Sequence, residues 1–310
     1  MAERQANTES VVTVVVAGLA NLLIAAAKVL AGLISGSAAM LSEGAHSIAD
    51  TATEVLLFTA LRRGARPADV QHPFGYGKES YVWAFIAAIF TFVVGAGFSI
   101  THGVNTIRHG EHSGEYVVSY VVLATSFVIE SVSLTRAVRQ VRRRSRERGI
   151  SSARYLRHTP DTMVKAVFLE DSAALIGISL AALGVWLSEI TGNELWDGLA
   201  SIAIGLLLLV VAAVLARSNI SLLVGQAVPP RVHREIHQEL AGLPTVERVH
   251  TLFTMYLGPD EILVAAKVDF RDEATGAEIE AEADRAEQRL VARYPAVSYV
   301  FLDPTHGRSP

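Results

Sequence analysis

The first part of the chain alternates long apolar segments with short polar connections. Six apolar segments stand out, at Val11–Leu33, Ser37–Leu61, Val82–Ile107, Tyr116–Val138, Met163–Ile190 and Leu195–Ala216. A helix of about 20 apolar residues crosses the hydrocarbon core of a bilayer, and each segment reaches that length. The pattern therefore predicts six transmembrane helices.

Beyond Pro229 and Pro230 the pattern becomes that of a small soluble α+β domain. Helix, strand, strand, helix and strand are expected in turn at Val232–Leu243, Val246–Leu257, Ile262–Phe270, Ala274–Tyr294 and Val297–Leu302. This order fits a ferredoxin-like open-faced sandwich. We therefore expect a polar N-terminal tail over residues 1–10, a transmembrane domain over 11–222 and a cytoplasmic ferredoxin-like domain over 223–310.

Composition also indicates a membrane protein. Hydrophobic residues make up 51% of the 310 residues and charged residues 19%, and the mean hydropathy is +0.35. These values are too apolar for an ordinary soluble chain of this length. The chain has no cysteine, which excludes disulfides, thiolate metal sites and thiol redox chemistry.

Positive charge in the connections predicts the orientation. Arg62, Arg63, Arg66 and Lys78 lie between the second and third segments, and eight arginines from Arg139 to Arg157 lie between the fourth and fifth. Lys and Arg stay on the cytoplasmic side, so both termini are expected there, in a multi-pass protein of a bacterial-type plasma membrane. Beside a membrane, the arginine run is expected to anchor the topology or to meet anionic lipid rather than nucleic acid.

The second apolar segment carries Glu43, His46, Asp50 and Glu54 on one stripe, because steps of three and four residues return to the same helix face. A charged group at mid-bilayer costs about 2.5–3.5 kcal/mol, so such groups normally face a cavity or a partner. His46 and Asp50 present a nitrogen and an oxygen ligand side by side, which suits zinc and similar ions. The alternative is a buried polar pair that only holds two helices together.

The fifth segment holds a second polar cluster, Glu170 and Asp171. Asp50 lies 12 residues from Arg62 and Asp171 lies ten from Asp161, which places both about 15–18 Å from the cytoplasmic end. The two clusters are therefore expected to meet at mid-membrane. They predict a metal site of His46, Asp50 and Asp171, with Glu170 nearby.

Three further intramembrane polar residues have structural interpretations. Asn21 and Lys28 in the first segment are expected to join helices or to balance the carboxylates. Glu130 in the fourth segment is either a proton relay or a hydrogen-bond acceptor near the site.

Longer motifs resemble the cation diffusion facilitator family of metal/proton antiporters. They are Gly36-Ser37-Ala38-Ala39-Met40 leading into His46-Ser47-Ile48-Ala49-Asp50, then His72-Pro73-Phe74-Gly75-Tyr76-Gly77-Lys78-Glu79, Asp171, Trp196-Asp197-Gly198-Leu199-Ala200-Ser201 and the α+β tail. The resemblance implies six transmembrane helices and a homodimer, which we expect the cytoplasmic domain to join, and efflux of Zn²⁺ or a related ion against protons. It also implies a transport site of four residues, two from the second helix and two from the fifth, each pair spaced i,i+4.

The chain departs from the family at Val167, four residues before Asp171, where zinc-transporting members usually have His. Glu43 and Leu169-Glu170-Asp171 resemble instead the branch that contains the ninth member of the human zinc-transporter (solute carrier 30) series, a mitochondrial protein. The candidates for the missing donor are Glu43, Glu130, Glu170 and water. We expect Glu170 to supply it and Glu43 to act as a base that orients His46.

Two further departures affect other metal sites of the family. Tyr76 stands at a loop position that is His in members with an extra loop site, so Asp69 and His72 are expected to bind metal only weakly. In the tail, His250 matches a family ligand, but Lys267 and Phe301 replace His, which argues against a zinc cluster there.

The leading hypothesis is secondary active transport of a divalent cation, with Zn²⁺ as the favoured cargo, protons as counter-ion and no resident cofactor. Histidine has a reference pKa of about 6.5, so metal and protons compete for it at ordinary pH. Alternatives are a preference for Mn²⁺, Fe²⁺ or Co²⁺, because a carboxylate replaces one imidazole, and a membrane metal sensor that does not transport. An enzyme is not expected, since the sequence has no His-Glu-x-x-His motif and no nucleophile–base pair near the cluster.

Overall fold

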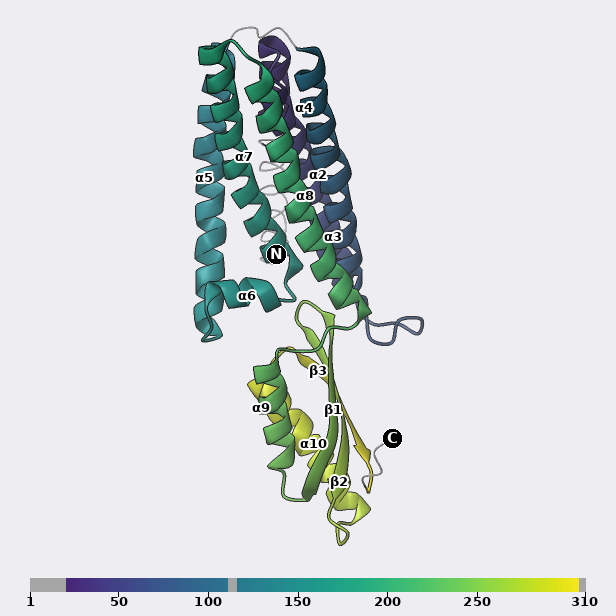
Figure 1. Cartoon of the computed structure of the whole chain (residues 1–310). Helices are drawn as coiled ribbons and strands as arrows, with labels where there is room; N and C mark the ends of the chain where they lie inside the picture. The colour runs from purple at the N-terminus through teal and green to yellow at the C-terminus, as the bar shows by residue number, and fades with distance from the viewer. Residues whose placement is uncertain (1–20, 111–115, 307–310) are drawn as a thin grey trace, which may run out of the picture. The chain divides into compact units, whose positions relative to one another are not determined.

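The computed structural model describes residues 21–110 and 116–306, which fall into two compact units (Figure 1). The first unit comprises the chain up to Thr59, Trp83–Arg157 and Thr162–Ser218. The second comprises Ala60–Val82, His158–Asp161 and the chain from Asn219 onward. The expected tail over residues 1–10 and the start of the first apolar segment lie outside the described residues, and the domain limit at residue 222 stays a prediction.

The first unit is a bundle of helices. Its first helix is described over Asn21–Ser35. There follow α2 (Ala38–Gly64), α3 (Glu79–Phe90), the π-helical turn η1 (Thr91–Ala96), α4 (Gly97–His109), α5 (Tyr116–Glu147), α6 (Ser152–His158), α7 (Thr162–Thr191) and α8 (Leu195–Val224). Since η1 joins α3 to α4 without a break, the third apolar segment forms one helix, Glu79–His109.

Four of the described helices are long and apolar enough to cross a membrane: Glu79–His109, Tyr116–Glu147, Thr162–Thr191 and Leu195–Val224. They are the third to sixth apolar segments, whose helical character is thereby confirmed. The second segment also forms a helix, α2, but its stripe of ionisable side chains makes it less apolar. The fourth segment forms a longer helix than expected. Helix α5 continues past Val138 to Glu147, because the arginines in this stretch are good helix formers.

Small residues let the helices of this unit approach closely. A Cβ added to Gly103 of α4 would lie 2.7 Å from the carbonyl oxygen of Gly198 in α8. A Cβ added to Gly205 would lie 3.1 Å from the Ala96 carbonyl oxygen. Such contacts bring backbones together where lipid supplies no hydrophobic driving force for helix association.

The N-terminus of α2 is capped by a side chain from α8. The Asp197 carboxylate accepts hydrogen bonds from the Ser37 hydroxyl at 2.7 Å and from the backbone N–H groups of Ala38 and Ala39. The first N–H groups of a helix have no partner within it, and the helix dipole favours an anion there. Asp197 therefore fixes the start of the helix that carries the ionisable stripe.

The second unit contains a three-stranded sheet in the order β1-β2-β3. The elements run α9 (Pro230–Ala241), β1 (Val246–Gly258), β2 (Glu261–Phe270), α10 (Gly276–Arg293) and β3 (Val297–Pro304), with β1 and β2 antiparallel and β2 and β3 parallel. The expected helix–strand–strand–helix–strand order is confirmed. Alternate residues of β2 are buried, and the core of the unit includes Ile236 of α9 and Leu290 of α10.

Removing the cap should weaken the helical unit. We expect Asp197→Ala to lower the free energy of unfolding by about 2 kcal/mol, because buried N–H groups lose their acceptor. Thermal unfolding of the purified protein in detergent measures this, with the exposed Asp284→Ala as the matched control. Equal unfolding temperatures for the two variants would contradict the capping role.

Candidate functional site

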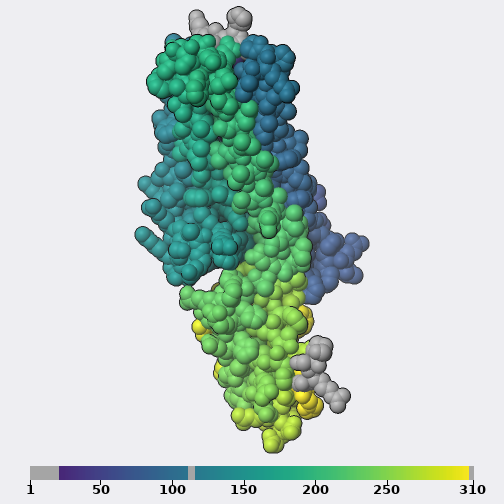
Figure 2. All heavy atoms as spheres, in the orientation of Figure 1, coloured from purple at the N-terminus to yellow at the C-terminus, as the bar shows by residue number. Residues whose placement is uncertain are grey.

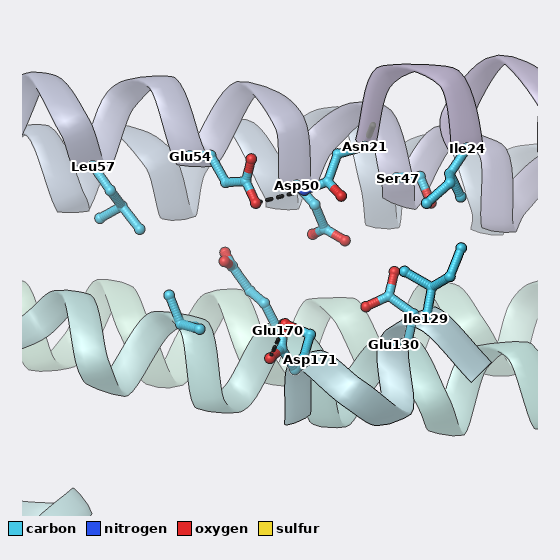
Figure 3. Close-up of a pocket in the computed structure, with 12 residues that line it drawn as sticks. Asn21, Ile24, Ser47, Asp50, Glu54, Leu57, Ile129, Glu130, Glu170 and Asp171 are labelled. Carbon is cyan, nitrogen blue, oxygen red and sulfur yellow. Dashed lines mark hydrogen bonds between the residues drawn. The ribbon is translucent and has the colours of Figure 1, made fainter. Parts of the chain in front are cut away.

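A cavity of about 100 Å³ lies within the helical unit, between the first helix, α2, α5 and α7 (Figure 3). It is lined by Asn21, Ile24, Ser47, Asp50, Glu54, Leu57, Ile129, Glu130, Ser133, Val167, Glu170 and Asp171. Five of these side chains are carboxylates, from three helices. In an apolar bundle each of them needs a hydrogen-bond donor, a proton or a cation.

The structure brings together three of the predicted site residues, Asp50 of α2 and Glu170 and Asp171 of α7. Figure 3 shows the Asp50 and Glu170 side chains extending from facing helices into the space between them. Val167 lines the same cavity, so the position at which the resemblance predicted a histidine lies beside the carboxylates.

His46 lies beside the cavity but does not line it. Its side chain is 1% exposed, and its Nδ1 atom is 3.4 Å from Asp50 Oδ1. Neither ring nitrogen makes a hydrogen bond within the described chain, and the same holds for Asp50 Oδ1 and Glu170 Oε1. Buried polar atoms without partners are rare and costly, so these atoms point to a ligand.

Glu43 occupies a separate position, deep between three helices. Its Oε2 atom lies 3.0 Å from Lys28 Nζ of the first helix, and both side chains are fully buried. Lys28 also donates to the Ser47 hydroxyl at 2.8 Å. A Cβ at Gly177 of α7 would overlap Glu43 Oε1, so glycine there makes room for the carboxylate. Glu43 is thus already paired with a basic side chain of the protein itself, Lys28.

Two cavity carboxylates have uncharged donors. Asn21 of the first helix donates to Glu54 at 2.6 Å, and Ser133 of α5 donates to Asp171 at 2.8 Å. The expected roles of Asn21 and Lys28, to join helices and to balance carboxylates, are confirmed. Glu130 lines the cavity, which is compatible with both of its predicted roles.

Across residues 21–110 and 116–306, no three His, Asp or Glu side chains lie close enough together to hold a metal ion as they stand. The carboxylates face each other across the cavity, and like charges keep apart unless a cation or a proton lies between them. The cavity therefore has oxygen donors of the kind that divalent cations prefer, but the described side chains are not gathered closely enough to bind one.

Two family models match the chain. The cation efflux transmembrane domain matches residues 14–224, and the cytoplasmic domain of cation efflux proteins matches residues 228–303. The chain belongs to the cation efflux family. With its long apolar helices, it is an integral membrane protein.

The relatives of this chain include proteins named as a zinc antiporter and as a manganese efflux protein. The mitochondrial proton-coupled zinc antiporter SLC30A9 of Homo sapiens is 34% identical over 243 residues, which are 78% of this chain and 43% of that protein. Metal tolerance protein C4 of Arabidopsis thaliana is 31% identical over 236 residues, 76% of this chain and 52% of that protein. The manganese efflux system protein MneP of Bacillus subtilis is 24% identical over 240 residues, 76% of this chain and 75% of that protein. The chain thus spans less than half the length of the human zinc antiporter.

Tyr76 occupies the loop position at which the sequence comparison with the family had suggested a missing histidine. Its hydroxyl donates to Asp69 Oδ2 at 2.7 Å, while Asp69 Oδ1 accepts from the backbone of Gln71 and His72. The hydrogen bond from Tyr76 holds the pKa of Asp69 below its usual range. Both oxygens of this carboxylate are therefore engaged by the chain itself, which is consistent with the expected weak metal binding.

In the second unit, the candidate metal ligand His250 has a partner within the chain, and Lys267 and Phe301 stand at the other two candidate positions. His250 Nε2 lies 3.4 Å from Asp269 Oδ2, and Lys267 stands opposite Asp303 in the β2–β3 register. Phe301 is exposed. These positions agree with the expectation that the tail of this cation efflux protein lacks the family's zinc cluster, which stays a prediction.

Sequence reasoning missed two hydroxyl groups at the site. Ser47 lies four residues after Glu43 on the same face of α2, a spacing that could have indicated it as a second partner for Lys28. Ser133 gave no such signal, because its contact with Asp171 depends on the rotation of α5 against α7.

The buried ion pair generates a stability prediction. We expect Lys28→Met to lower the free energy of unfolding by about 3–5 kcal/mol, because it leaves Glu43 buried without a partner. The double variant Lys28→Met/Glu43→Gln removes both charges and should recover most of this loss. Thermal unfolding in detergent measures both variants. A single variant as stable as the wild type, or a double variant less stable than the single, would contradict the pairing.

Proposed function

We propose that this protein is a secondary active transporter that exports a divalent transition-metal cation, with Zn²⁺ as the favoured cargo, in exchange for protons. The observation that carries the proposal is the set of buried polar atoms that make no hydrogen bond in or beside the cavity: the two His46 ring nitrogens, Asp50 Oδ1 and Glu170 Oε1. One imidazole and several carboxylates match the ligand preferences of Zn²⁺. The proton-coupled zinc antiporters among the relatives support the same cargo and counter-ion.

We assign the cargo ligands to His46, Asp50, Asp171 and Glu170. His46 and Asp50 follow one another on α2, and Asp171 and Glu170 face them from α7. A cation between these helices would offset the repulsion of the carboxylates, and protons on the same groups would do so as well. Metal and protons therefore compete for one set of groups, which is the basis for exchange.

The transport cycle follows from this competition. The cation enters from the cytoplasm along the Asp50 and Glu54 side of the cavity and displaces protons from its ligands. Rocking of the helices then exposes the site on the opposite side, where protons displace the metal. Glu43 is held by Lys28 and makes no hydrogen bond to the His46 ring, so we assign it no direct contact with the cargo.

The remaining features of the proposal concern the assembly. We propose six transmembrane helices, with the first helix and α2 completing the four long apolar ones. Both termini lie in the cytoplasm, and the C-terminal domain joins two copies of the chain, as the match to the family's cytoplasmic domain supports. A bacterial-type plasma membrane suits the arginine-rich connections, whereas the human relative is named as mitochondrial.

A preference for Mn²⁺, Fe²⁺ or Co²⁺ is the second candidate. The observation in its favour is the cavity lining, in which Val167 stands among five carboxylates and no imidazole. Oxygen-rich sites suit harder ions such as Mn²⁺. A relative named as a manganese efflux protein lies in the same family.

The first functional prediction concerns α2. We expect His46→Ala and Asp50→Asn each to abolish metal flux into proteoliposomes, because each removes a cargo ligand while the helix remains intact. The control variants His306→Ala and Asp272→Asn change the same residue types at exposed positions and should transport normally. Wild-type flux in both site variants, with folding confirmed by thermal unfolding, would remove the site from α2.

The second functional prediction separates Glu170 from Glu43. We expect Glu170→Gln to weaken Zn²⁺ binding more than Lys28→Met/Glu43→Gln does, because Glu170 lines the cavity and Glu43 does not. Val167→His in the Glu170→Gln background should restore part of the affinity and shift preference toward Zn²⁺ over Mn²⁺.

Isothermal titration of the purified protein with each metal measures these affinities. Normal binding by Glu170→Gln together with lost binding in the Lys28/Glu43 double variant would reverse the assignment. A Val167→His variant that gains nothing would show that this position does not face the cargo.

A further inference from the structure

The end of α5 and the following helix α6 carry a dense arginine cluster. Nine arginines lie between Arg136 and Arg157, with Glu147 as the one carboxylate in that stretch. All nine are exposed. Arg143 Nε is 3.8 Å from Glu147 Oε1, an exposed pair that offsets little of the charge. The cluster therefore presents a strongly positive surface on the helical unit.

The buried side of α5 shows which way this surface faces. Ala137, Val141 and Ser145 recur every four residues and are buried. A helix turns about 100° per residue, so Arg139, Arg143 and Arg146 lie on the opposite side. In Figure 2 the teal atoms of α5 lie at the edge of the helical unit.

The same outer side of α5 is apolar along the rest of its length. Val117, Val121, Val128 and Val132 are exposed large hydrophobic residues, spaced by four, seven and four positions. Arg139 follows Val132 after seven positions, and Arg143 and Arg146 follow after four and three. One helix face thus changes from valine to arginine within about two turns, as expected where lipid tails give way to headgroups.

The turn after α5 holds this end of the helix in place. Gly149 has a φ of 61°, which reverses the chain, and α6 returns Tyr155 to a small core with Val141 and Val164. The Arg148 guanidinium lies 5.2 Å from the centre of the Tyr155 ring. Because α6 packs on the buried side of α5, it leaves the outer arginines uncovered.

We propose that Arg139, Arg143 and Arg146 form a binding site for the phosphate groups of anionic phospholipids. The guanidinium group is planar and always charged, and it binds phosphate oxygens with two parallel hydrogen bonds. The direct continuation of the valine face selects a lipid rather than a soluble phosphate or nucleic acid. A bilayer that surrounds the valines places its headgroups at the level of these arginines.

The protein purified in detergent allows a test by native mass spectrometry. The protein is equilibrated with equal amounts of phosphatidylglycerol and phosphatidylcholine, and the retained lipids are counted. We expect the wild type to retain phosphatidylglycerol preferentially. The variant Arg139→Gln/Arg143→Gln/Arg146→Gln should lower that preference about tenfold or more, since each basic group near an anionic surface contributes substantially to lipid binding.

A matched control removes the same charge elsewhere. Arg234→Gln/Arg271→Gln/Arg289→Gln neutralises three exposed arginines of the second unit and should retain the wild-type preference. Equal retention of the two lipids by the wild type, or an equal loss in both triple variants, would overturn the site. Arginine-dependent binding of a short RNA or DNA duplex without lipid preference would overturn it in favour of nucleic acid.

Discussion

The stability of the helical unit depends on which partner each buried ionisable side chain has. An ionisable group in an apolar bundle costs several kcal/mol unless a partner offsets it. Lys28 Nζ and Glu43 Oε2 lie 3.0 Å apart, so each of these two buried side chains has a partner of opposite charge. The described part of the chain offers the cavity no such balance, because five carboxylates line it and the side chains that donate hydrogen bonds to them, Asn21 and Ser133, are uncharged. Either a divalent cation or added protons would neutralise these carboxylates. Because one can replace the other, the cavity is suited to the exchange of metal for protons.

The surrounding structure positions these charges. Asp197 of α8 caps the first turn of α2, and the ionisable stripe begins within two turns of that cap. Gly177 of α7 leaves space for the Glu43 carboxylate, so α2 and α7 can approach closely beside the Lys28–Glu43 pair. The π-helical turn η1 lies beside α2, where Thr53 and Thr91 hydroxyls are 3.2 Å apart. Such turns often occur at functional sites, because they interrupt regular helix packing.

The lengths of the apolar segments and the positions of turn-forming residues predicted the helices and strands well. The order of the C-terminal domain and the third to sixth helices follow from apolar runs and from Pro and Gly signals, which act locally. The juxtaposition of Asp50 with Asp171 followed from counting residues to the membrane surface, because helix rise is fixed. Counting residues could not identify the partner of Glu43, because Lys28 and a bound metal ion would each supply the positive charge. The contact of Ser133 with Asp171 and the extension of α5 to Glu147 depend on helix rotation and on packing across the bundle, which periodicity alone does not encode.

The central claim is that metal and protons exchange at one cavity, and proton-driven metal uptake by sealed proteoliposomes tests it most directly. Vesicles with an acidic interior are placed in a medium with equal Zn²⁺ on both sides, with the membrane potential clamped at zero. The account predicts that Zn²⁺ accumulates inside as protons leave, and that dissipating the pH gradient abolishes accumulation. Zn²⁺ that equilibrates only down its own gradient, at a rate and extent independent of the pH difference, would contradict it.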